Sequence, residues 1–237
     1  MKDYSKKISI VIRTYNEEKH IKSVLESIYS QDYKNFEVII VDSQSTDNTL
    51  KICSSYPCNI VNIKKSRFNY SYASNIGAAN SSGDIICYLS GHSVIKKNDY
   101  LSYAASLFRD NSIGGVYGEV IALSDGSIIE KLFNGIGYIK SLLKGIVYET
   151  KIHPGILSCS NAMLRKDIWE KHKFKEELGA GGEDVEMANC ILDDGYKIIK
   201  VPKLLVKHSH GSNIKAFIKE FKAWRLMYED VLNYINK

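Results

Sequence analysis

The sequence lacks several features that would assign it to a specialised class. Its 237 residues contain five cysteines and three prolines, and no two cysteines form a CxxC pair. An odd set of this kind excludes a disulfide framework and is typical of reduced, mostly buried thiols in a cytosolic protein. No run approaches the roughly 18 apolar residues that span a bilayer, and the N-terminal residues do not have the pattern of a signal peptide. We therefore expect one soluble domain, or one domain with an appendage.

The charge balance is only slightly basic. Thirty-two lysines and arginines stand against 27 acidic residues, which gives a net charge of +5, and 44% of the residues are hydrophobic. That apolar fraction excludes disorder and fibrous repeats. The basic excess favours phosphate-bearing ligands or anionic lipid, but it is too small for a nucleic-acid-binding protein.

The first 90 residues alternate short β-type runs with helical patterns. We expect strands at residues 8–12, 36–41, 59–63 and 84–89, and helices at residues 17–30, from residue 45 and at residues 71–79. Such alternation predicts an α/β fold with a mostly parallel, Rossmann-like sheet flanked by helices. Ligands of such sheets bind beyond the carboxyl ends of the strands, so the residues after 12, 41 and 89 are the candidates for function.

The remaining residues follow a different rhythm. Helices are predicted at residues 98–109, 166–172, 183–193 and 214–235, and strands at residues 114–121, 198–201 and 204–206. The apolar segment 128–147 is interrupted by three glycines, and it fits either a lid over an acceptor or a buried helix pair. The final helix mixes lysines with aromatic residues, a pattern that suits an anionic membrane surface, the protein body or a second subunit.

The turn after the first strand excludes one large class of enzymes. A dinucleotide-binding fold needs the pattern Gly-x-Gly-x-x-Gly at this place, and residues 13–18 contain no glycine. A phosphate-binding loop of the Walker type is absent from the whole sequence. An NAD-dependent oxidoreductase is therefore disfavoured. Thr14 and Asn16 can hydrogen-bond a ligand or cap the following helix, and the turn alone does not separate these alternatives.

The turn after the second strand carries two acids of different character. Ser45 or Thr46 can cap a helix, and Asp47 suits the positive end of its dipole, so Asp47 is interpreted as structural. Asp42 has no comparable local role. We therefore expect Asp42 to accept hydrogen bonds from a ligand.

Together these turns resemble the nucleotide-sugar-binding half of family 2 glycosyltransferases, which have the GT-A fold. The resemblance rests on SIVIRTYNEE at residues 9–18 and EVIIVDSQSTDNT at 37–49, and continues through SNIGAA at 74–79, SGD at 82–84, CSNAMLRK at 159–166 and GEDVE at 182–186. It implies a glycosyltransferase domain over residues 1–212, with a donor half to about residue 95 and an acceptor half from about residue 96. Residues 213–237 would then form a C-terminal basic amphipathic helix.

The resemblance also assigns residues to the donor. It implies a nucleotide pocket lined at the strand ends, and a second group of side chains that approach the base and phosphates. The pocket residues are Thr14, Asn16, Glu17, Asp42, Ser45 and Ser90, and the second group is Arg67, Asn69 and Asn75.

One element of the family pattern is missing. Members usually carry an Asp-x-Asp-like motif after the fourth strand, whereas residues 89–93 read LSGHS. His92, with His208 or His210, could bind a divalent cation, and imidazole suits Mn²⁺ or a later transition metal better than Mg²⁺. Alternatively, these histidines and nearby lysines or arginines contact the diphosphate without a metal. In a third alternative they are structural and catalysis has been lost.

The matching family motif also suggests a catalytic base. Residues 179–182 form a glycine-rich loop, and two acids then begin a helix. An inverting transfer needs a base opposite the leaving diphosphate. The resemblance assigns this role to Asp184, and Glu183 would orient the acceptor.

The leading hypothesis is a cytoplasmic, inverting enzyme of bacterial surface-polysaccharide assembly. It would transfer sugar from a nucleotide-diphosphate sugar to a glycan or lipid-linked saccharide, with peripheral contact at the inner face of the membrane or a homo-oligomer formed through the last helix. Because the acidic motif is missing, the alternative is a non-catalytic protein that binds a nucleotide sugar or a glycan.

Overall fold

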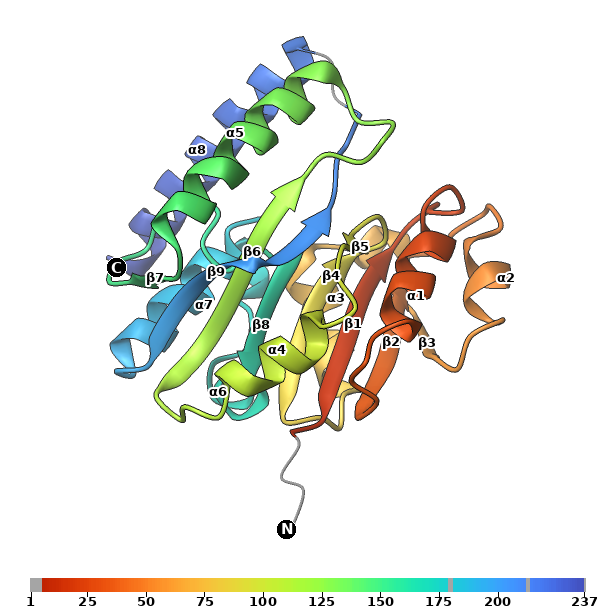
Figure 1. Cartoon of the computed structure of the whole chain (residues 1–237), viewed down its shortest axis with the longest axis horizontal. Coiled ribbons are helices and arrows are strands. Elements are labelled where there is room, and N and C mark those ends of the chain that lie inside the picture. Colours follow the sequence, from red (N-terminus) through yellow and green to blue (C-terminus); the bar gives the residue numbers. More distant parts are fainter. Residues whose placement is uncertain (1–5, 179–180, 212–213, 237) are drawn as a thin grey trace.

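The computed structural model describes residues 6–178, 181–211 and 214–236 (Figure 1). Its first four strands are parallel, in the order β3-β2-β1-β4. Helices connect them on both faces of the sheet. The strands are β1 (Ile8–Thr14), β2 (Phe36–Asp42), β3 (Asn59–Asn62) and β4 (Ile85–Ser90), and the helices are α1 (Ile21–Tyr29), α2 (Thr49–Cys53) and α3 (Tyr70–Ala79).

The sheet continues through the second half of the chain. The order after β4 is β8-β6-β9-β5, and β7 also pairs with β9. β8 is antiparallel to both β4 and β6, so β6 again runs parallel to β1. These strands are β5 (Val94–Ile95), β6 (Ile113–Ile121), β7 (Val147–Glu149), β8 (Asn161–Arg165) and β9 (Lys197–Lys207). The predicted α/β fold with a mostly parallel sheet is confirmed.

Five helices accompany these strands within the described residues. They are α4 (Tyr100–Leu107), α5 (Ile128–Lys144), α6 (Lys166–His172), α7 (Glu183–Asp193) and α8 (Ile214–Ile235). The α6, α7 and α8 bounds match the predicted ones. α5 and α8 lie side by side beyond β6 and β9, where Phe133 contacts Phe217 with ring centroids 5.3 Å apart (Figure 1). Segment 128–147 is thus mainly one helix, paired with α8 but not buried.

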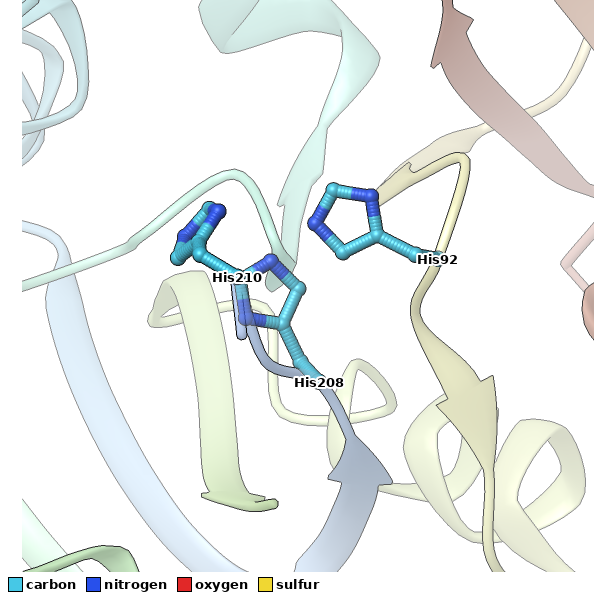
Figure 2. A group of neighbouring side chains, drawn as sticks. All are labelled: His92, His208 and His210. Carbon is cyan, nitrogen blue, oxygen red and sulfur yellow. The ribbon is translucent and has the colours of Figure 1, made fainter. Parts of the chain in front are cut away.

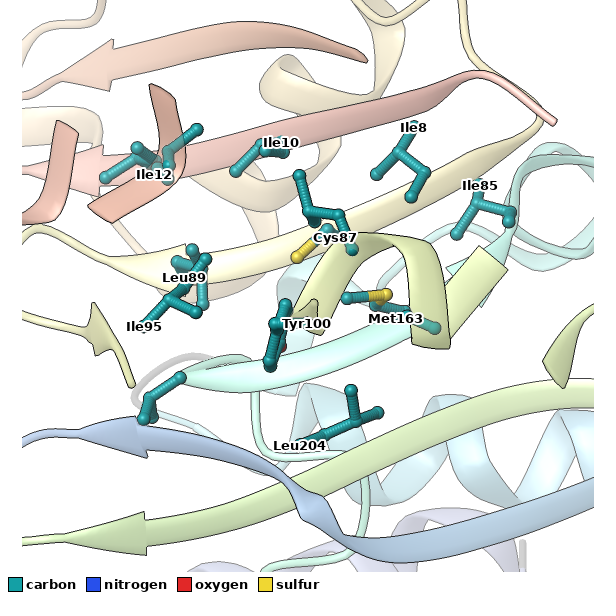
Figure 3. Packing of buried hydrophobic residues seen from close by; sticks show 14 of the residues in the cluster. Ile8, Ile10, Ile12, Ile85, Cys87, Leu89, Ile95, Tyr100, Met163 and Leu204 are labelled. Atoms are coloured by element: carbon teal, nitrogen blue, oxygen red, sulfur yellow. The ribbon is translucent and has the colours of Figure 1, made fainter. Parts of the chain in front are cut away.

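The core lies on both faces of the sheet because successive strand residues point to opposite sides. Ile10 of β1 and Cys87 of β4 pack on the face covered by α1 and α4, where Tyr100 is 2% exposed (Figure 3). Their neighbours Val11 and Tyr88 pack on the other face, under α3, α6 and α7. All five cysteines are free, as the sequence suggested.

Asn161 fixes β8 in the middle of the sheet. Its side-chain oxygen accepts a hydrogen bond from the Tyr100 hydroxyl at 2.6 Å. Its amide group donates to the Glu119 carbonyl at 2.8 Å and to the Leu204 carbonyl at 3.0 Å. One buried side chain therefore joins α4, β6, β8 and β9.

Several predicted boundaries were wrong. α1 begins at Ile21 rather than at Glu17, and α2 begins at Thr49 rather than near Ser45. The two strands expected at 198–201 and 204–206 are one continuous strand, β9. The start of α8 at Ile214 agrees with the expected C-terminal helix, but residues 212–213, where the domain boundary was placed, lie outside the described residues.

Candidate functional site

The candidate site lies at the carboxyl edge of the parallel strands. Thr14 at the end of β1 is in register with Asp42 at the end of β2, and Arg13 is in register with Ser90 at the end of β4. The three turns predicted to carry function therefore meet at one edge. Ser90 lies there with its hydroxyl 2.9 Å from that of Ser93.

Asp42 is hydrogen-bonded to both of the first two turns. It is fully buried, and its carboxylate accepts hydrogen bonds from the Thr14 hydroxyl at 3.0 Å and from the Ser45 hydroxyl and amide at 2.6 and 2.8 Å. The expectation that Asp42 has no local structural role was wrong. Because Thr14 and Ser45 point their hydroxyls at Asp42, these three residues hold the shape of the turn, and their contact with a donor stays a prediction.

Asn16 and Asp47 join the first two turns. Asn16 has a positive φ of 54° and is exposed. Its side-chain oxygen accepts a hydrogen bond from the Thr46 backbone amide at 2.8 Å, and its backbone amide donates one to the Ser45 hydroxyl. Asp47 accepts from Thr49 and from the Glu18 amide, which supports the structural interpretation of Asp47. Residues 17–20 and 45–48, which the sequence predicted to be helical, form these hydrogen bonds between the turns instead.

The predicted base and phosphate residues surround the start of α3. Asn69 caps α3 by accepting from the Tyr72 amide at 2.6 Å, and the Arg67 guanidinium lies over the Tyr72 ring at 4.7 Å. Asn75 uses its side chain inside the protein: it donates to the Phe174 carbonyl and accepts from the Trp169 indole, both at 2.9 Å. Arg67 is exposed and is the most accessible of the three predicted residues.

The three histidines meet at this edge (Figure 2). His92 follows β4, whereas His208 and His210 follow β9, and one ring nitrogen of each lies within 4.8 Å of the others. The ring centroids of His92 and His208 are 4.5 Å apart. Burial and the neighbouring His92 hold the pKa values of His208 and His210 below their ordinary range. Three imidazoles are a donor set that a divalent transition metal accepts.

Glu17 completes this cluster. Its carboxylate lies 2.8 Å from Nδ1 of His92, so Nδ1 carries the proton and donates. Nε2 of His92 is buried and has no hydrogen-bond partner in the described part of the chain. A carboxylate behind a histidine fixes the tautomer and frees the other nitrogen for a metal. The residues present therefore fit a divalent cation. The sequence had placed Glu17 in the nucleotide pocket and gave no sign of its contact with His92.

Asp184 and Glu183 begin α7 and occupy different environments. Glu183 is 4% exposed, and its carboxylate pairs with the Arg13 guanidinium at 3.3 Å. Asp184 is mostly buried, and its carboxylate forms no ion pair with a cationic side chain within the described residues. Burial, and then the negative charge of Glu183, raise the pKa of Asp184 to about 7. A carboxyl of this kind can exchange a proton near neutral pH. Of residues 179–182, only Gly181 and Gly182 lie within the described residues.

Arg13 contacts both one of the acids and the start of α3, and no sequence motif marked it as a site residue. Its guanidinium contacts Glu183, the Ser74 hydroxyl at 3.2 Å and the Tyr70 ring at 5.0 Å. Its charge also acts on His208. Arg13 thus contacts one of the two acids directly, and its charge reaches the histidine cluster. A charged residue near the end of an otherwise mostly apolar, buried strand was the feature of the sequence that could have identified Arg13 as a site residue.

A cavity of about 280 Å³ adjoins the same edge. It lies between the end of β6 and α5, and its lining includes Tyr117, Glu119, Phe133, Ser158 and Lys200. Lys200 pairs with Glu119 at 2.7 Å. A second cavity, of about 310 Å³, lies near the opposite edge, and its acids Asp167 and Asp194 are already paired with basic side chains. Of these two cavities in the described part of the chain, the one of about 280 Å³ lies at the edge of the candidate site.

Comparison with known families assigns the chain to one of them. The family described as Glycosyl transferase family 2 matches residues 9–173. The chain belongs to this family. Its matched region runs from β1 to the end of α6 and contains Glu17, Asp42 and His92, whereas Asp184, His208 and His210 lie beyond it.

Curated relatives of this family 2 chain are glycosyltransferases. The amylovoran biosynthesis glycosyltransferase AmsB of Erwinia amylovora is 30% identical over 222 residues, covering 88% of this chain and 70% of AmsB. The O-antigen chain rhamnosyltransferase RfbN of Salmonella typhimurium is 27% identical, covering 86% of this chain and 67% of RfbN. Glycosyltransferase GlyA of Streptococcus pneumoniae is 25% identical over 84% of this chain, which spans only 30% of GlyA.

Solved structures confirm the GT-A fold predicted for this family member. The mannosyltransferase PcManGT of Pyrobaculum calidifontis, solved with GDP-Man and Mn²⁺, aligns with a TM-score of 0.68 and 21% identity over 97% of this chain and 63% of that one. S. aureus TarS 1-349 aligns with a TM-score of 0.64 and 19% identity over 86% of this chain and 60% of that one. None of the described helices of the family 2 chain is long and apolar enough to cross a membrane.

Proposed function

We propose that this chain transfers a sugar, with inversion, from a nucleotide-diphosphate sugar to a glycan or lipid-linked saccharide. The observation that carries the proposal is the meeting of a candidate base and a candidate diphosphate-binding cluster at one sheet edge, where Arg13 pairs with Glu183, the neighbour of that base. Family membership and relatives such as the rhamnosyltransferase RfbN support the reaction class. The nucleotide sugars in the solved relatives support the donor class.

Asp184 is the proposed base. With a pKa near 7, a large fraction of its carboxyl is ionised at neutral pH and can accept the proton of an acceptor hydroxyl. Glu183 forms an ion pair with Arg13, so its carboxylate is less free to turn toward an acceptor hydroxyl. Its proposed role is to shape the acceptor site and to keep a negative charge beside Asp184.

The histidine cluster is the proposed site of a divalent cation. His92, His208 and His210 would hold it, and when bound it would supply a Lewis acid to the donor diphosphate. Glu17 keeps the His92 proton on Nδ1, and the unpartnered Nε2 supports cation binding over a purely structural role. Solved GT-A relatives contain Mn²⁺, and imidazole ligands favour it over Mg²⁺.

The nucleotide would lie against the first two turns. Asp42, Thr14 and Ser45 shape this surface, while Asn16 and Arg67 offer exposed polar groups beside it. The Lys65 ammonium lies 4.2 Å from the centre of the Tyr15 ring at the same place, which adds a cation and an aromatic face. The cationic groups here would bind a phosphate, and the aromatic face would contact the nucleotide base.

A panel of nucleotide sugars tests the proposal. Release of nucleoside diphosphate should occur with one donor, require an acceptor for full rate, and respond to added Mn²⁺ or Mg²⁺. The alternative, a protein that only binds its sugar, rests on the missing acidic motif. Calorimetric binding of a donor without release across donors, acceptors and cations would favour that alternative.

The proposed function includes a location for the chain in the cell. We place the chain in the cytoplasm, at the inner face of the membrane, where nucleotide sugars and lipid-linked acceptors meet. The basic helix α8 exposes Lys215, Lys219, Lys222 and Arg225, and contact through it with a membrane or a second subunit stays a prediction.

A further inference from the structure

The outward face of α5 is apolar. Five large aliphatic side chains recur at helical spacing along it, and each is more than half exposed: Ile128 (78%), Leu132 (58%), Ile136 (53%), Ile139 (59%) and Leu143 (84%). At 100° per residue these five positions fall within about 80° of one another. They form one continuous strip along a helix of 17 residues, which we name the α5 strip.

The opposite side of α5 is polar and faces the protein. Glu130 is 4% exposed and Ser141 is 7% exposed, although both are polar. Glu130 forms a capping box with Ser127, and its carboxylate also accepts from the His210 amide at 2.9 Å. A surface helix of a soluble protein normally buries its apolar side. Here the orientation is reversed, and an exposed apolar strip of this length indicates a surface that another apolar phase covers.

Cations lie beside the strip. Lys131 and Lys140 occupy positions on its two flanks, and Lys144 follows near the end of α5, all of them exposed. The sole acid of α5 is the buried Glu130. The neighbouring helix α8 adds exposed lysines and Ile218, which is 51% exposed. Apolar side chains flanked by lysines match the depth profile of an anionic bilayer, whose acyl region takes the former and whose headgroups attract the latter.

We propose that the α5 strip docks the chain on an anionic lipid bilayer, with the helix lying in the plane of the interface. A second copy of the chain fits this surface less well. Two α5 strips packed together would bring Lys131, Lys140 and Lys144 of both copies into one interface, and α5 offers no exposed acid to pair with them. Like charges in contact oppose such a pairing, whereas anionic headgroups satisfy them.

Docking through α5 also orients the candidate site. The inner side of the same helix contributes Phe133, Asn134 and Gly137 to the 280 Å³ cavity, which holds the Glu119–Lys200 pair. One helix thus separates the proposed lipid surface from this cavity beside the sheet edge. Resting on the proposed transferase function, this arrangement selects a lipid-linked saccharide as the acceptor, because its lipid would stay in the bilayer while its sugar enters the cavity.

Vesicle flotation with the full chain tests the docking without any sugar donor. We expect the chain to float with phosphatidylcholine vesicles that contain phosphatidylglycerol and to bind much less to phosphatidylcholine alone. Ile136→Gln/Ile139→Gln should lower the partition coefficient at least about tenfold, while Ile136→Leu/Ile139→Leu keeps it. Lys131→Gln/Lys140→Gln should also weaken binding, in contrast to Lys51→Gln/Lys96→Gln, which removes the same charge from exposed lysines elsewhere.

The outcomes separate this inference from the proposed function. Failure of the wild-type chain to bind anionic vesicles, or unchanged binding of the glutamine variant, would overturn docking whatever the catalytic result. A wild-type dimer that the glutamine variant converts to a monomer, without vesicle binding, would assign the strip to a second copy instead. Vesicle binding by a chain that releases no nucleoside diphosphate would retain docking and reject the transferase function. Circular dichroism of each variant verifies that it is folded.

Discussion

His92 donates its Nδ1 hydrogen to the carboxylate of Glu17, 2.8 Å away and 75 positions earlier in the sequence. The pair joins the turn after β1 to the turn after β4 and leaves Nε2 of His92 aimed at no protein partner among the described residues. We infer from this contact that Glu17 positions the histidine cluster, and the nucleotide contact expected from the sequence stays a prediction.

Replacing Glu17 should weaken cation binding. We expect Glu17→Ala to lower the affinity for Mn²⁺ about 10–100-fold, because His92 loses the partner that fixes its tautomer and orientation. Isothermal calorimetry without donor measures this directly. The matched control is Glu18→Ala, since Glu18 is exposed and its carboxylate bonds only to Asn48 in the described structure. Equal affinities of the two variants would remove Glu17 from the cluster.

Asp184→Asn should abolish most of the turnover. A positioned general base contributes about 10²–10⁴-fold to a rate, and the amide cannot accept the proton. The rate of nucleoside diphosphate release should fall by that factor, with donor binding retained. Asp193→Asn is the control because Asp193 is exposed at the other end of the same helix. Normal turnover of Asp184→Asn would require another base.

The pH dependence should follow the raised pKa of Asp184. Since the base acts when ionised, kcat/KM should fall about tenfold per pH unit below pH 7 and level off above it. A profile measured at subsaturating donor and acceptor gives the apparent value. A flat profile between pH 5.5 and pH 7 (roughly the range in which this group titrates) would contradict the assignment.

The same shift makes a prediction about stability. Between the ordinary carboxyl range and pH 7 the folded state binds more protons than the unfolded state, so the free energy of unfolding falls as pH rises. Asp184→Asn removes this penalty. We expect the variant to melt above the wild type at pH 8 and the difference to shrink toward pH 4, as measured by thermal unfolding. A difference that grows toward low pH would have the wrong sign.

Breaking the Arg13–Glu183 pair should destabilise the fold. The two side chains are 11% and 6% exposed, so Arg13→Met leaves a buried carboxylate without its partner. We expect this to lower the free energy of unfolding by about 3 kcal/mol. Adding Glu183→Gln should recover part of that loss, which denaturant unfolding of the double variant would show. Arg165→Met is the comparison, because the partner Asp167 is 56% exposed and the loss should stay under about 1 kcal/mol. Similar losses for both arginines would argue against a special role for Arg13.

The parts of the fold that repeat locally could be predicted from the sequence. The apolar runs of β1 and β4 and the periodic helices α6, α7 and α8 have the predicted type and nearly the predicted bounds. β8 was missed as a strand because its place between β4 and β6 depends on pairing with distant residues. Local periodicity does not report such pairing.

The candidate site divides in the same way. The strand-end rule brought Asp42, Ser90 and His92 to one edge, and the family motif singled out Asp184. The hydrogen bonds that decide the role of each side chain are long-range, as in Asp42 with Thr14 or Glu17 with His92, and no spacing in the sequence encodes them. The reversed orientation of α5 was equally invisible, because an amphipathic pattern does not state which side faces the protein.

The central place of β8 also has a consequence for synthesis on the ribosome. β8 pairs with β4 on the side away from β1, and it is synthesised roughly 70 residues after β4. This edge of β4 therefore stays unpaired for roughly 4–14 s at ordinary translation rates. An open, apolar strand edge is a template for aggregation during that interval. The nascent donor half is therefore the stage at which this chain depends most on chaperones, and fragments that end before residue 161 should accumulate as insoluble protein.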